Sequence, residues 1–511
     1  MSKSSEPQSL EIELKFTGSD AQLSMAFSAL TDGRTTHAEE MHSIYFDTSC
    51  LDLARRGYVL RTRKFGTGLC ELTLKSGSGD SPIARNEWTA ELAKPAVDLS
   101  LLPRGAFEQD LVDVHSGSLE ARFSTRVTRS IAVVGFREST VEVALDSGSV
   151  RADKLSEPIA ELELELKSGS VNDLVAMART AVADFGLRLD PDSKAAKGAR
   201  LADPHAGKQA FKANLPRLSP SDDAASSLQK IASSTASHLL CNRIVAQTGS
   251  HPEGVHQVRV ALRRLRSALM VFRPVLTHRG RRVARDARTV FRALGPVRDL
   301  DVFLTETLGQ LSAQETSVDG LTSLVMVAQR RRASNQERAS AVLGDGTLDQ
   351  LLLDLLEISV SSERFVGRFR NDLASEFSSI LTKRHETALE LGSEDLATLD
   401  PAELHLLRLQ LKKLRYACDL ARGVFPSAKS TGFTKRLAAL QEWLGAANDA
   451  IVAMEIAGEL AEADDQASEG AEAVQELYDR QLAELHPRIA SAWNKFTKSR
   501  LFWCRNRPAC N

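Results

Sequence analysis

The hydrophobic period of this chain changes near residue 205, and that change limits the possible folds more than any other feature. Before it, short segments alternate between apolar and polar residues, as in residues 10–16 (LEIELKF) and 159–167 (IAELELELK). A period of two predicts half-buried β-strands, because successive side chains of a strand point to opposite faces. From residue 224 onward the apolar residues recur at helical spacing. We therefore expect an N-terminal β-rich domain and a C-terminal helical domain.

Six segments have the strand period, and Gly-, Ser- and Asp-rich breaks such as residues 76–80 (SGSGD) separate them. They are residues 10–16, 58–64, 69–75, 84–92, 139–146 and 159–167. A helix is expected at residues 171–185. With 511 residues, the chain exceeds what one core usually organises. The predicted division is residues 1–205 for the β-rich domain, 206–222 for a proline-containing linker, 223–500 for the helical domain and 501–511 for a tail.

The polar faces of the predicted strands carry ordered charges. Glu11, Glu13 and Lys15 share one face, as do Arg61 and Arg63 on a second strand. On one strand such a face could simply be solvated, but six strands with the same property favour an enclosed site. Charges inside a closed sheet must be paired or bound to a ligand. Carboxylates suit Mg²⁺ or Mn²⁺, and Arg and Lys suit phosphate oxygens, so the pattern predicts a tunnel that holds divalent cations and a polyanion.

An ordered series of motifs spans roughly residues 8–200. It begins with Glu11-Ile12-Glu13-Leu14-Lys15, an ExExK pattern. The rest of the series is His42 with Tyr45-Phe46-Asp47-Thr48, Leu60-Arg61-Thr62-Arg63, Leu72-Thr73-Leu74-Lys75, Arg85-Asn86-Glu87, Arg126 with Arg129, Glu142 with Asp146, Glu161-Leu162-Glu163-Leu164-Glu165, and Ser193-Lys194. This series resembles the CYTH, or triphosphate tunnel metalloenzyme, superfamily.

The resemblance implies an antiparallel β-barrel tunnel that hydrolyses or cyclises triphosphates with Mg²⁺ or Mn²⁺ as cofactor. It implies metal ligation by Glu11, Glu13, Asp146, Glu161 and Glu163. It implies catalytic roles for Glu11, Glu13, Lys15, Arg61, Arg63, Lys75 and Arg85, and substrate binding by Arg126, Arg129 and Lys194. The segment FSTRVTRS leaves open which of its arginines faces inward, and Glu11 and Glu163 both remain candidates for orienting or deprotonating the attacking water.

The helical half contains an internal repeat. Residues 255–269 (VHQVRVALRRLRSAL) and 404–418 (LHLLRLQLKKLRYAC) share the pattern H-x-x-R-x-x-x-[RK]-[RK]-x-R. A second matched pair, residues 294–302 (LGPVRDLDV) and 444–452 (LGAANDAIV), follows at the same offset. Two matched segments in the same order indicate a duplicated helical bundle.

Each copy of the repeat predicts a helix with one basic face. His256, Arg259, Arg263 and Arg266 fall within an arc of about 80°, next to an apolar stripe. The net charge of the chain is −2, yet residues 256–298 hold 12 Arg and a single acid. Two such faces brought together would repel each other, so a polyanion is the expected ligand. Aromatic residues make up only 5% of the chain, which favours a phosphate chain over nucleic acid.

This half, about residues 223–500, resembles the CHAD domain, which is associated with inorganic polyphosphate. The resemblance implies polyphosphate binding by His256, Arg259, Arg263, Arg264, Arg266, Arg298, His405, Arg408, Lys412, Lys413 and Arg415. Asp299 and Asp449 are expected to hold helix N-termini or to orient basic side chains rather than to contact the ligand. His278 and His385 match no motif and are expected at the surface.

The two resemblances together imply a metal-dependent triphosphatase, similar to bacterial inorganic triphosphatases, whose helical domain binds long-chain polyphosphate. Alternatives are a tunnel enzyme for thiamine triphosphate or nucleoside triphosphates, including an adenylate cyclase, and a non-catalytic polyphosphate-binding scaffold. Nucleic-acid binding ranks third, and the oligomeric state stays open. The six cysteines are scattered, and the chain has no apolar run of membrane-spanning length or of signal-peptide type. We therefore expect a cytoplasmic protein without a membrane partner. Association with polyphosphate granules is compatible with this location.

Overall fold

The structure is a computed structural model of the chain. It describes residues 9–34, 37–77, 83–103, 106, 114–190, 192–203, 210–213, 216–313, 320–392, 396, 399, 401–425 and 427–504. The chain divides into two compact units. The barrel unit comprises Met1–Phe211, Ala236–Cys241 and Gly346–Ser361, and the helical unit comprises Lys212–Thr235, Asn242–Asp345 and Ser362–Asn511. None of the described helices has the length and apolarity needed to cross a bilayer.

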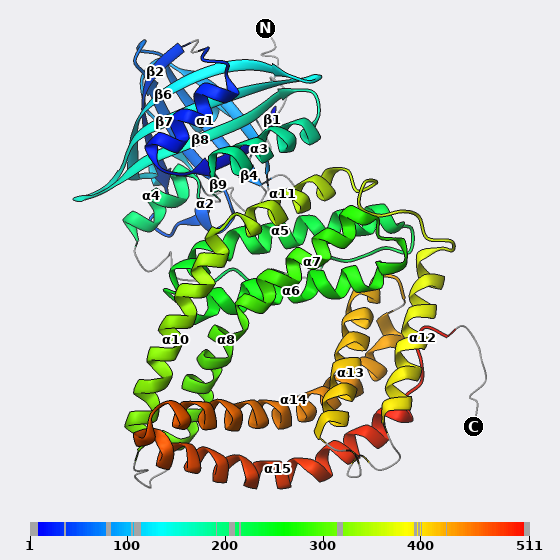
Figure 1. Cartoon of the computed structure of the whole chain (residues 1–511). Coiled ribbons are helices and arrows are strands. Elements are labelled where there is room, and N and C mark those ends of the chain that lie inside the picture. Colours follow the sequence, from blue (N-terminus) through cyan, green and yellow to red (C-terminus); the bar gives the residue numbers. More distant parts are fainter. Residues whose placement is uncertain are drawn as a thin grey trace. The chain divides into compact units, whose positions relative to one another are not determined.

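The barrel unit is a closed antiparallel barrel (Figure 1). Its strands are β1 (Ser9–Thr17), β2 (His37–Asp47), β3 (Val59–Phe65), β4 (Cys70–Gly77), β5 (Ala84–Leu92), β6 (Glu120–Phe136), β7 (Ser139–Ala152) and β8 (Leu155–Ser168). They pair in the order β5-β4-β3-β2-β6-β7-β8-β1, and β1 closes the barrel by pairing with β5. A short strand, β9 (Arg188–Leu189), extends the edge of β1.

The cavity inside this barrel is lined mostly by charged residues, and the outer face is apolar where helices cover it. In β1 and β8 the outward residues Leu14, Phe16, Leu162 and Leu164 are almost completely buried, because helices cover that face. The helices of this unit are α1 (Asp20–Leu30), α2 (Asp52–Arg55), α3 (Val171–Phe185), α4 (Lys194–Ala202) and α11 (Thr347–Val360). Burial of the apolar face outside leaves the charged face of each strand directed into the barrel.

All six segments that the alternation marked as strands are strands, and α3 has the predicted bounds. Two long strands, β2 and β6, carried no such prediction. The pairing of β2 with β6 shifts register between Tyr45 and Phe46, where β6 passes from Phe123 to Ala121 and so has one extra residue. Which side chains of β2 and β6 point into the barrel is therefore set by pairing with neighbouring strands more than by the sequence pattern of these two strands.

The helical unit is built around the repeated helices α6 (Pro252–Val271) and α13 (Pro401–Ala421), which contact each other. The other helices of the unit are α5 (Ala224–Thr248), α7 (His278–Ala293), α8 (Gly295–Val302), α9 (Leu308–Ser312), α10 (Leu321–Gly344), α12 (Leu373–Leu391), α14 (Ser427–Ala463) and α15 (Ser468–Thr497), although the central residues 236–241 of α5 group with the barrel unit. The apolar stripes predicted for the repeats are buried, as Leu262 and Leu411 show. In Figure 1 the long helices α14 and α15 lie side by side.

The prediction for His385 was wrong. This side chain is 7% exposed and lies among the rings of Phe433, Phe496 and Trp503. A lone histidine gives no periodic signal, so its burial depends on the aromatic residues that the fold brings around it. His278 is exposed, as predicted.

Candidate functional site

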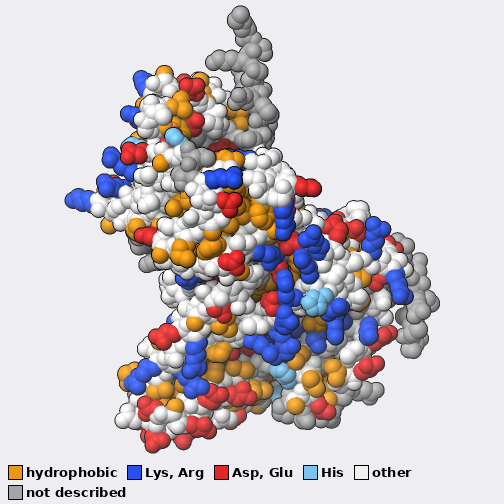
Figure 2. All heavy atoms as spheres, turned by 45° about the horizontal axis from the view of Figure 1, so that its top comes forward, with side chains coloured by type: hydrophobic (Ala, Val, Ile, Leu, Met, Phe, Trp, Pro, Cys, Tyr) orange, Lys and Arg blue, Asp and Glu red, His pale blue; other side chains and the backbone are white. Residues whose placement is uncertain are grey.

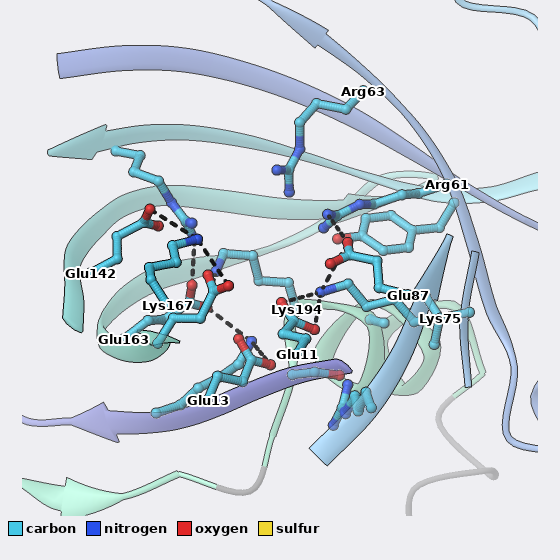
Figure 3. A pocket seen from close by; sticks show the side chains of 18 residues that line it. Glu11, Glu13, Arg61, Arg63, Lys75, Glu87, Glu142, Glu163, Lys167 and Lys194 are labelled. Carbon is cyan, nitrogen blue, oxygen red and sulfur yellow. Dashed lines mark hydrogen bonds and ion pairs between the residues drawn. The ribbon is translucent and has the colours of Figure 1, made fainter. Parts of the chain in front are cut away.

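A cavity of about 230 Å³ lies inside the barrel, and every barrel strand contributes a side chain to it (Figure 3). Its described lining residues are Glu11, Glu13, Lys15, Tyr45, Val59, Arg61, Arg63, Lys75, Arg85, Glu87, Arg129, Glu142, Glu163, Glu165, Lys167, Ser193, Lys194 and Ala195. Eight of these side chains are cationic and six are carboxylates. The lining thus has a surplus of positive charge, which favours an anionic ligand.

Three buried carboxylates form a cluster at one side of this cavity. Ligand atoms of Asp146, Glu161 and Glu163 lie within 4.8 Å of one another, and the residues are 0%, 0% and 6% exposed. Asp146 of β7 stands directly opposite Glu161 of β8, an arrangement of like charges that destabilises a sheet unless a cation intervenes. A donor set made only of carboxylates fits a hard divalent cation such as Mg²⁺ or Mn²⁺.

Lys194 occupies the centre of this acidic cluster. Its Nζ lies 2.5 Å from Asp146 Oδ2 and 2.9 Å from Glu163 Oε1, and it also contacts Glu161. Lys194 is the first residue of α4, and Ser193 caps that helix by accepting a hydrogen bond from the Ala196 backbone N–H. Burial opposes the charged form, but the surrounding carboxylates raise the pKa of Lys194 above its ordinary value. A cation therefore already sits where the donor set requires one.

Glu163 is the most strongly paired carboxylate of the cluster. It accepts hydrogen bonds from Arg129 and Lys194 and forms a 2.9 Å ion pair with Lys15. Burial alone would raise its pKa, but Arg129, Lys15 and Lys194 hold the pKa of Glu163 well below its usual range. Glu163 is thus permanently ionised near neutral pH, as a metal or cation ligand must be.

Glu11 and Glu13 line the same cavity but lie outside the cluster of three. Lys75 Nζ donates to both oxygens of Glu11, at 2.6 and 2.5 Å, and lies 3.5 Å from Glu87. Figure 3 shows this group continuing to Arg61, whose Nη2 is 3.9 Å from Glu87. Glu13 is paired with Lys15 at 3.3 Å. The sequence interpretation treated five carboxylates as one set of metal ligands. In the fold, three of them form the cluster, whereas Glu11 and Glu13 lie apart from it and pair with lysines.

Arg63 supplies positive charge that no acid balances. Its Nε donates to Ser43 Oγ at 3.1 Å, and among the described residues no carboxylate lies within ion-pairing distance of it. Burial, together with Arg61 and Arg129, lowers the pKa of Arg63 to about 10. The neighbouring Arg61 has a buried Nε without a hydrogen-bond acceptor in the described part of the chain. Both observations indicate a place for the oxygens of an anion.

Arg126 does not belong to this cavity, and its predicted place was wrong. Arg129 lines the cavity and donates to Asp146, whereas Arg126, an odd number of residues away on β6, is exposed on the opposite face. Because strand side chains alternate, only one of these two arginines can face inward. Arg85 and Lys75 line the cavity as expected.

The sequence interpretation gave no individual role to Tyr45, which lines the cavity, or to Lys197, which is not among the described lining residues but pairs with the acidic cluster. Tyr45 stacks on Phe123 with ring centroids 4.6 Å apart, and although burial opposes ionisation, Arg61 and Arg63 lower its pKa. Lys197 pairs with Glu161 at 3.1 Å and with Asp190 at 3.0 Å. Its position three residues after Lys194 on one helix face was the signal that could have identified it.

The basic faces of the two repeats converge in the helical unit. Burial, with Arg408, Arg263 and Arg259 nearby, lowers the pKa of Lys412 to about 8. The arginines come from both α6 and α13, and Arg263 stacks over the ring of Tyr416 of α13 at 5.7 Å. On the face of the molecule drawn in Figure 2, Lys and Arg side chains gather in one broad area that also holds histidine side chains.

The other predicted basic residues divide into two groups. His256 and Arg298 belong to the convergence, since burial and Arg298 lower the pKa of His256. Asp449 lies 3.7 Å from Arg408, which fits the orienting role expected of it. The remaining basic residues have local partners or are exposed. Arg264 donates to the Ala213 carbonyl, Arg266 stacks on Phe291, and Arg415 donates to Gln441. His405 and Lys413 are exposed.

Comparison with known families supports this division of the chain. The model of the CYTH domain matches residues 9–199, and the model of the CHAD domain matches residues 230–458. The first match covers all strands of the barrel, and the second covers both copies of the helical repeat.

An inorganic triphosphatase of Haemophilus influenzae is 34% identical over 158 residues. This match covers 30% of the present chain and 44% of that protein, so it spans less than half the length of this relative. Among solved structures, the CHAD domain of the plant Ricinus communis is 26% identical with a TM-score of 0.49, and the alignment covers 57% of this chain and 98% of that one. A protein from Hippeastrum, described as a candidate adenylyl cyclase with a dominant triphosphatase activity, is 21% identical with a TM-score of 0.29, over 40% and 97% of the two chains.

Proposed function

The chain carries a CYTH domain followed by a CHAD domain, and on that premise we propose that it hydrolyses inorganic triphosphate to pyrophosphate and phosphate. The reaction would take place in the barrel cavity and depend on Mg²⁺ or Mn²⁺. The observation that carries this proposal is the cavity lining, which has a surplus of cations and includes Glu163, one of a buried cluster of three carboxylates. The inorganic triphosphatase activity of the Haemophilus influenzae relative supports the same substrate.

The basic and the acidic residues of the cavity would have different roles in this reaction. Arg61, Arg63 and Lys75 would hold the phosphate oxygens and stabilise the negative charge that develops during cleavage. Asp146, Glu161 and Glu163 would hold the divalent cation, which supplies charge neutralisation at the phosphate oxygens.

The attacking water needs a proton acceptor other than Glu163. A carboxylate whose pKa is held far below its usual range is a weak base, so Glu163 suits ligation. Burial raises the pKa of Glu165, which also lines the cavity. Of these two carboxylates, Glu165 is therefore the better proton acceptor near neutral pH.

The size of the cavity favours an inorganic substrate. Its volume of about 230 Å³ is below the roughly 300–1,000 Å³ typical of pockets for organic ligands. Its lining is almost entirely charged, with Tyr45, Val59 and Ala195 among the few exceptions.

A second candidate substrate is an organic triphosphate, because an apolar pocket adjoins the cavity. This pocket measures about 420 Å³ and shares Tyr45, Lys75 and Arg85 with the cavity. Its other walls include Phe46, Leu60 and alanines of α4. A thiamine or adenine group could lie there while its phosphates reach the basic side chains.

The helical unit would bind long-chain polyphosphate at the convergence of α6 and α13. Burial lowers the pKa values of Arg259, Arg408 and Lys412, and neighbouring cations lower those of Arg259 and Lys412 further, a repulsion that a polyanion would relieve. The Nε of Arg408 is buried without a hydrogen-bond acceptor among the described residues, and a phosphate oxygen would supply one.

The test is phosphate release from tripolyphosphate, thiamine triphosphate, ATP and long polyphosphate, each with Mg²⁺, Mn²⁺ or EDTA. We expect metal-dependent release from tripolyphosphate that is lost in a Glu11→Gln/Glu13→Gln protein and retained in Glu157→Gln, a change at an exposed residue of β8. If an organic triphosphate is hydrolysed faster than tripolyphosphate, the second candidate substrate is the correct one. No turnover of any substrate, with polyphosphate still bound, would leave a non-catalytic scaffold.

A further inference from the structure

Three basic side chains form a row across the outside of the barrel. His42 of β2 stands directly opposite Lys64 of β3 and directly opposite Arg126 of β6. Residues opposite each other in an antiparallel sheet point to the same face, with Cβ atoms about 5 Å apart. The row therefore spans two strand spacings, roughly 10 Å.

The row faces away from the cavity in the barrel. The neighbouring residues in sequence, Ser43 and Arg63, are directed inward, where Arg63 lines the cavity. Lys64 and Arg126 are exposed. A ligand bound to this row would consequently be separate from the proposed substrate.

The row lines a basin of its own. Its volume is about 430 Å³, and Thr128 and the glycines Gly66 and Gly148 contribute to its wall. Gly148 is required by the packing, because a Cβ atom there would lie 2.0 Å from the Arg126 carbonyl oxygen. Glu40 is the one acid among the described residues of the wall, and it forms no ion pair with the three basic groups.

Like charges placed opposite one another in a sheet cost stability unless something neutralises them. Burial, followed by Arg126 and then Lys64, lowers the pKa of His42. Within the described part of the chain, neither Lys64 nor Arg126 has a carboxylate partner. The sheet thus places two cations, Lys64 and Arg126, on either side of a histidine at the floor of an open basin, and a bound anion would favour protonation of that histidine.

We propose that this row is a second anion site, which binds an oxyanion of two or more linked phosphate groups on the outside of the barrel. The ends of the row lie roughly 10 Å apart, so pyrophosphate or a longer phosphate chain can contact Lys64 and Arg126 while their side chains stay apart, and its higher charge favours it over a single phosphate group. Thr128 offers an uncharged hydroxyl group at the margin of the row. The site does not depend on the proposed hydrolysis, because none of its charged groups lines the cavity.

The experiment measures how fast Lys64 of the full chain is acetylated by a dilute acylating reagent, read by peptide mass spectrometry. The probe is sodium pyrophosphate without divalent cations, compared with sodium chloride of equal ionic strength. Pyrophosphate at about ten times its Kd should slow acetylation of Lys64 roughly tenfold. Lys154, exposed in the turn between β7 and β8, should react at an unchanged rate.

The variants decide whether the row is responsible. Arg126→Ala should abolish the protection of Lys64, while Arg122→Ala, on the same strand but outside the row, should retain it. The Glu11→Gln/Glu13→Gln protein should also retain it, which separates this site from the cavity. Orthophosphate should protect only at a much higher concentration. Absent protection, or protection that survives Arg126→Ala or needs an intact cavity, would overturn the proposal.

Discussion

Among single residues, Glu163 has the most ion pairs in the cavity, since its carboxylate pairs with Arg129, Lys15 and Lys194 at once. We expect Glu163→Gln to lower kcat for tripolyphosphate by about 10²–10³-fold, because a neutral amide neither holds a divalent cation nor anchors three cations. The measurement is steady-state phosphate release at saturating Mn²⁺. Glu157→Gln is the matched control, and a kcat close to that of the unchanged protein would contradict the role of Glu163.

Lys194 contacts the same carboxylates that we propose as ligands of a divalent cation, so the two would compete. Lys194→Met should therefore raise the affinity for Mn²⁺ by about tenfold or more, while the protein without metal becomes less stable. Mn²⁺ titration followed by electron paramagnetic resonance gives the affinity, and thermal unfolding with and without Mn²⁺ gives the stability. Lys154→Met serves as control. Unchanged or weaker Mn²⁺ binding would show that Lys194 does not occupy the cation position.

We expect the proposed polyphosphate binding to depend on pH through Lys412. Its pKa of about 8 lies below the ordinary lysine value, so the side chain loses its charge as the pH rises from about 7 to about 9. Affinity for long polyphosphate should fall across this window, and binding near pH 8 should take up protons. In Lys412→Arg, which keeps its charge, the fall should be smaller. Equal pH dependence in the two proteins would exclude Lys412 as its source.

At the scale of elements, α11 is the helix whose place the sequence least reveals. It lies within the CHAD match, yet it belongs to the barrel unit and packs on α3. Arg179 of α3 donates to Asp354 at 2.7 Å and to Glu357 at 2.9 Å, and both carboxylates are almost completely buried. The two elements are therefore held together by a buried ion-pair group as well as by apolar contacts.

Arg179→Ala should weaken the packing of α11 on α3 by about 1.5–3 kcal/mol, because two buried carboxylates lose a charged donor. Hydrogen exchange of peptides from both helices should accelerate by one to two orders of magnitude. Arg151→Ala, at an exposed arginine of β7, is the control. Exchange that speeds up no more than in this control would indicate that apolar contacts alone hold the pair.

At the scale of the whole molecule, the net charge of −2 describes neither unit, because each gathers its own surplus of positive charge around a separate site. We expect the two activities to separate. Glu13→Gln should lose hydrolysis and keep polyphosphate binding, and Arg263→Glu/Lys412→Glu should do the reverse. Binding should also weaken steeply with added salt, since the basic residues of the helical unit are partly solvated. Loss of both activities in either protein would contradict this independence.

The sequence by itself determined the period of each half, the internal repeat and the identity of the charged residues. Alternation located β1 and β8, and it required Glu11 and Glu13 to share a face, because a strand repeats every two residues. Only the tertiary structure decided how charges from different strands combine. The register of β7 on β8 sets Asp146 opposite Glu161, and α4 brings Lys194 between them. The pairing of β6 with β7 sets Arg129 opposite Asp146 and so directs Arg129 inward and Arg126 outward. Local sequence patterns contain no information on strand register or helix docking, since both depend on contacts between residues far apart in the chain, and the candidate site is made of such contacts.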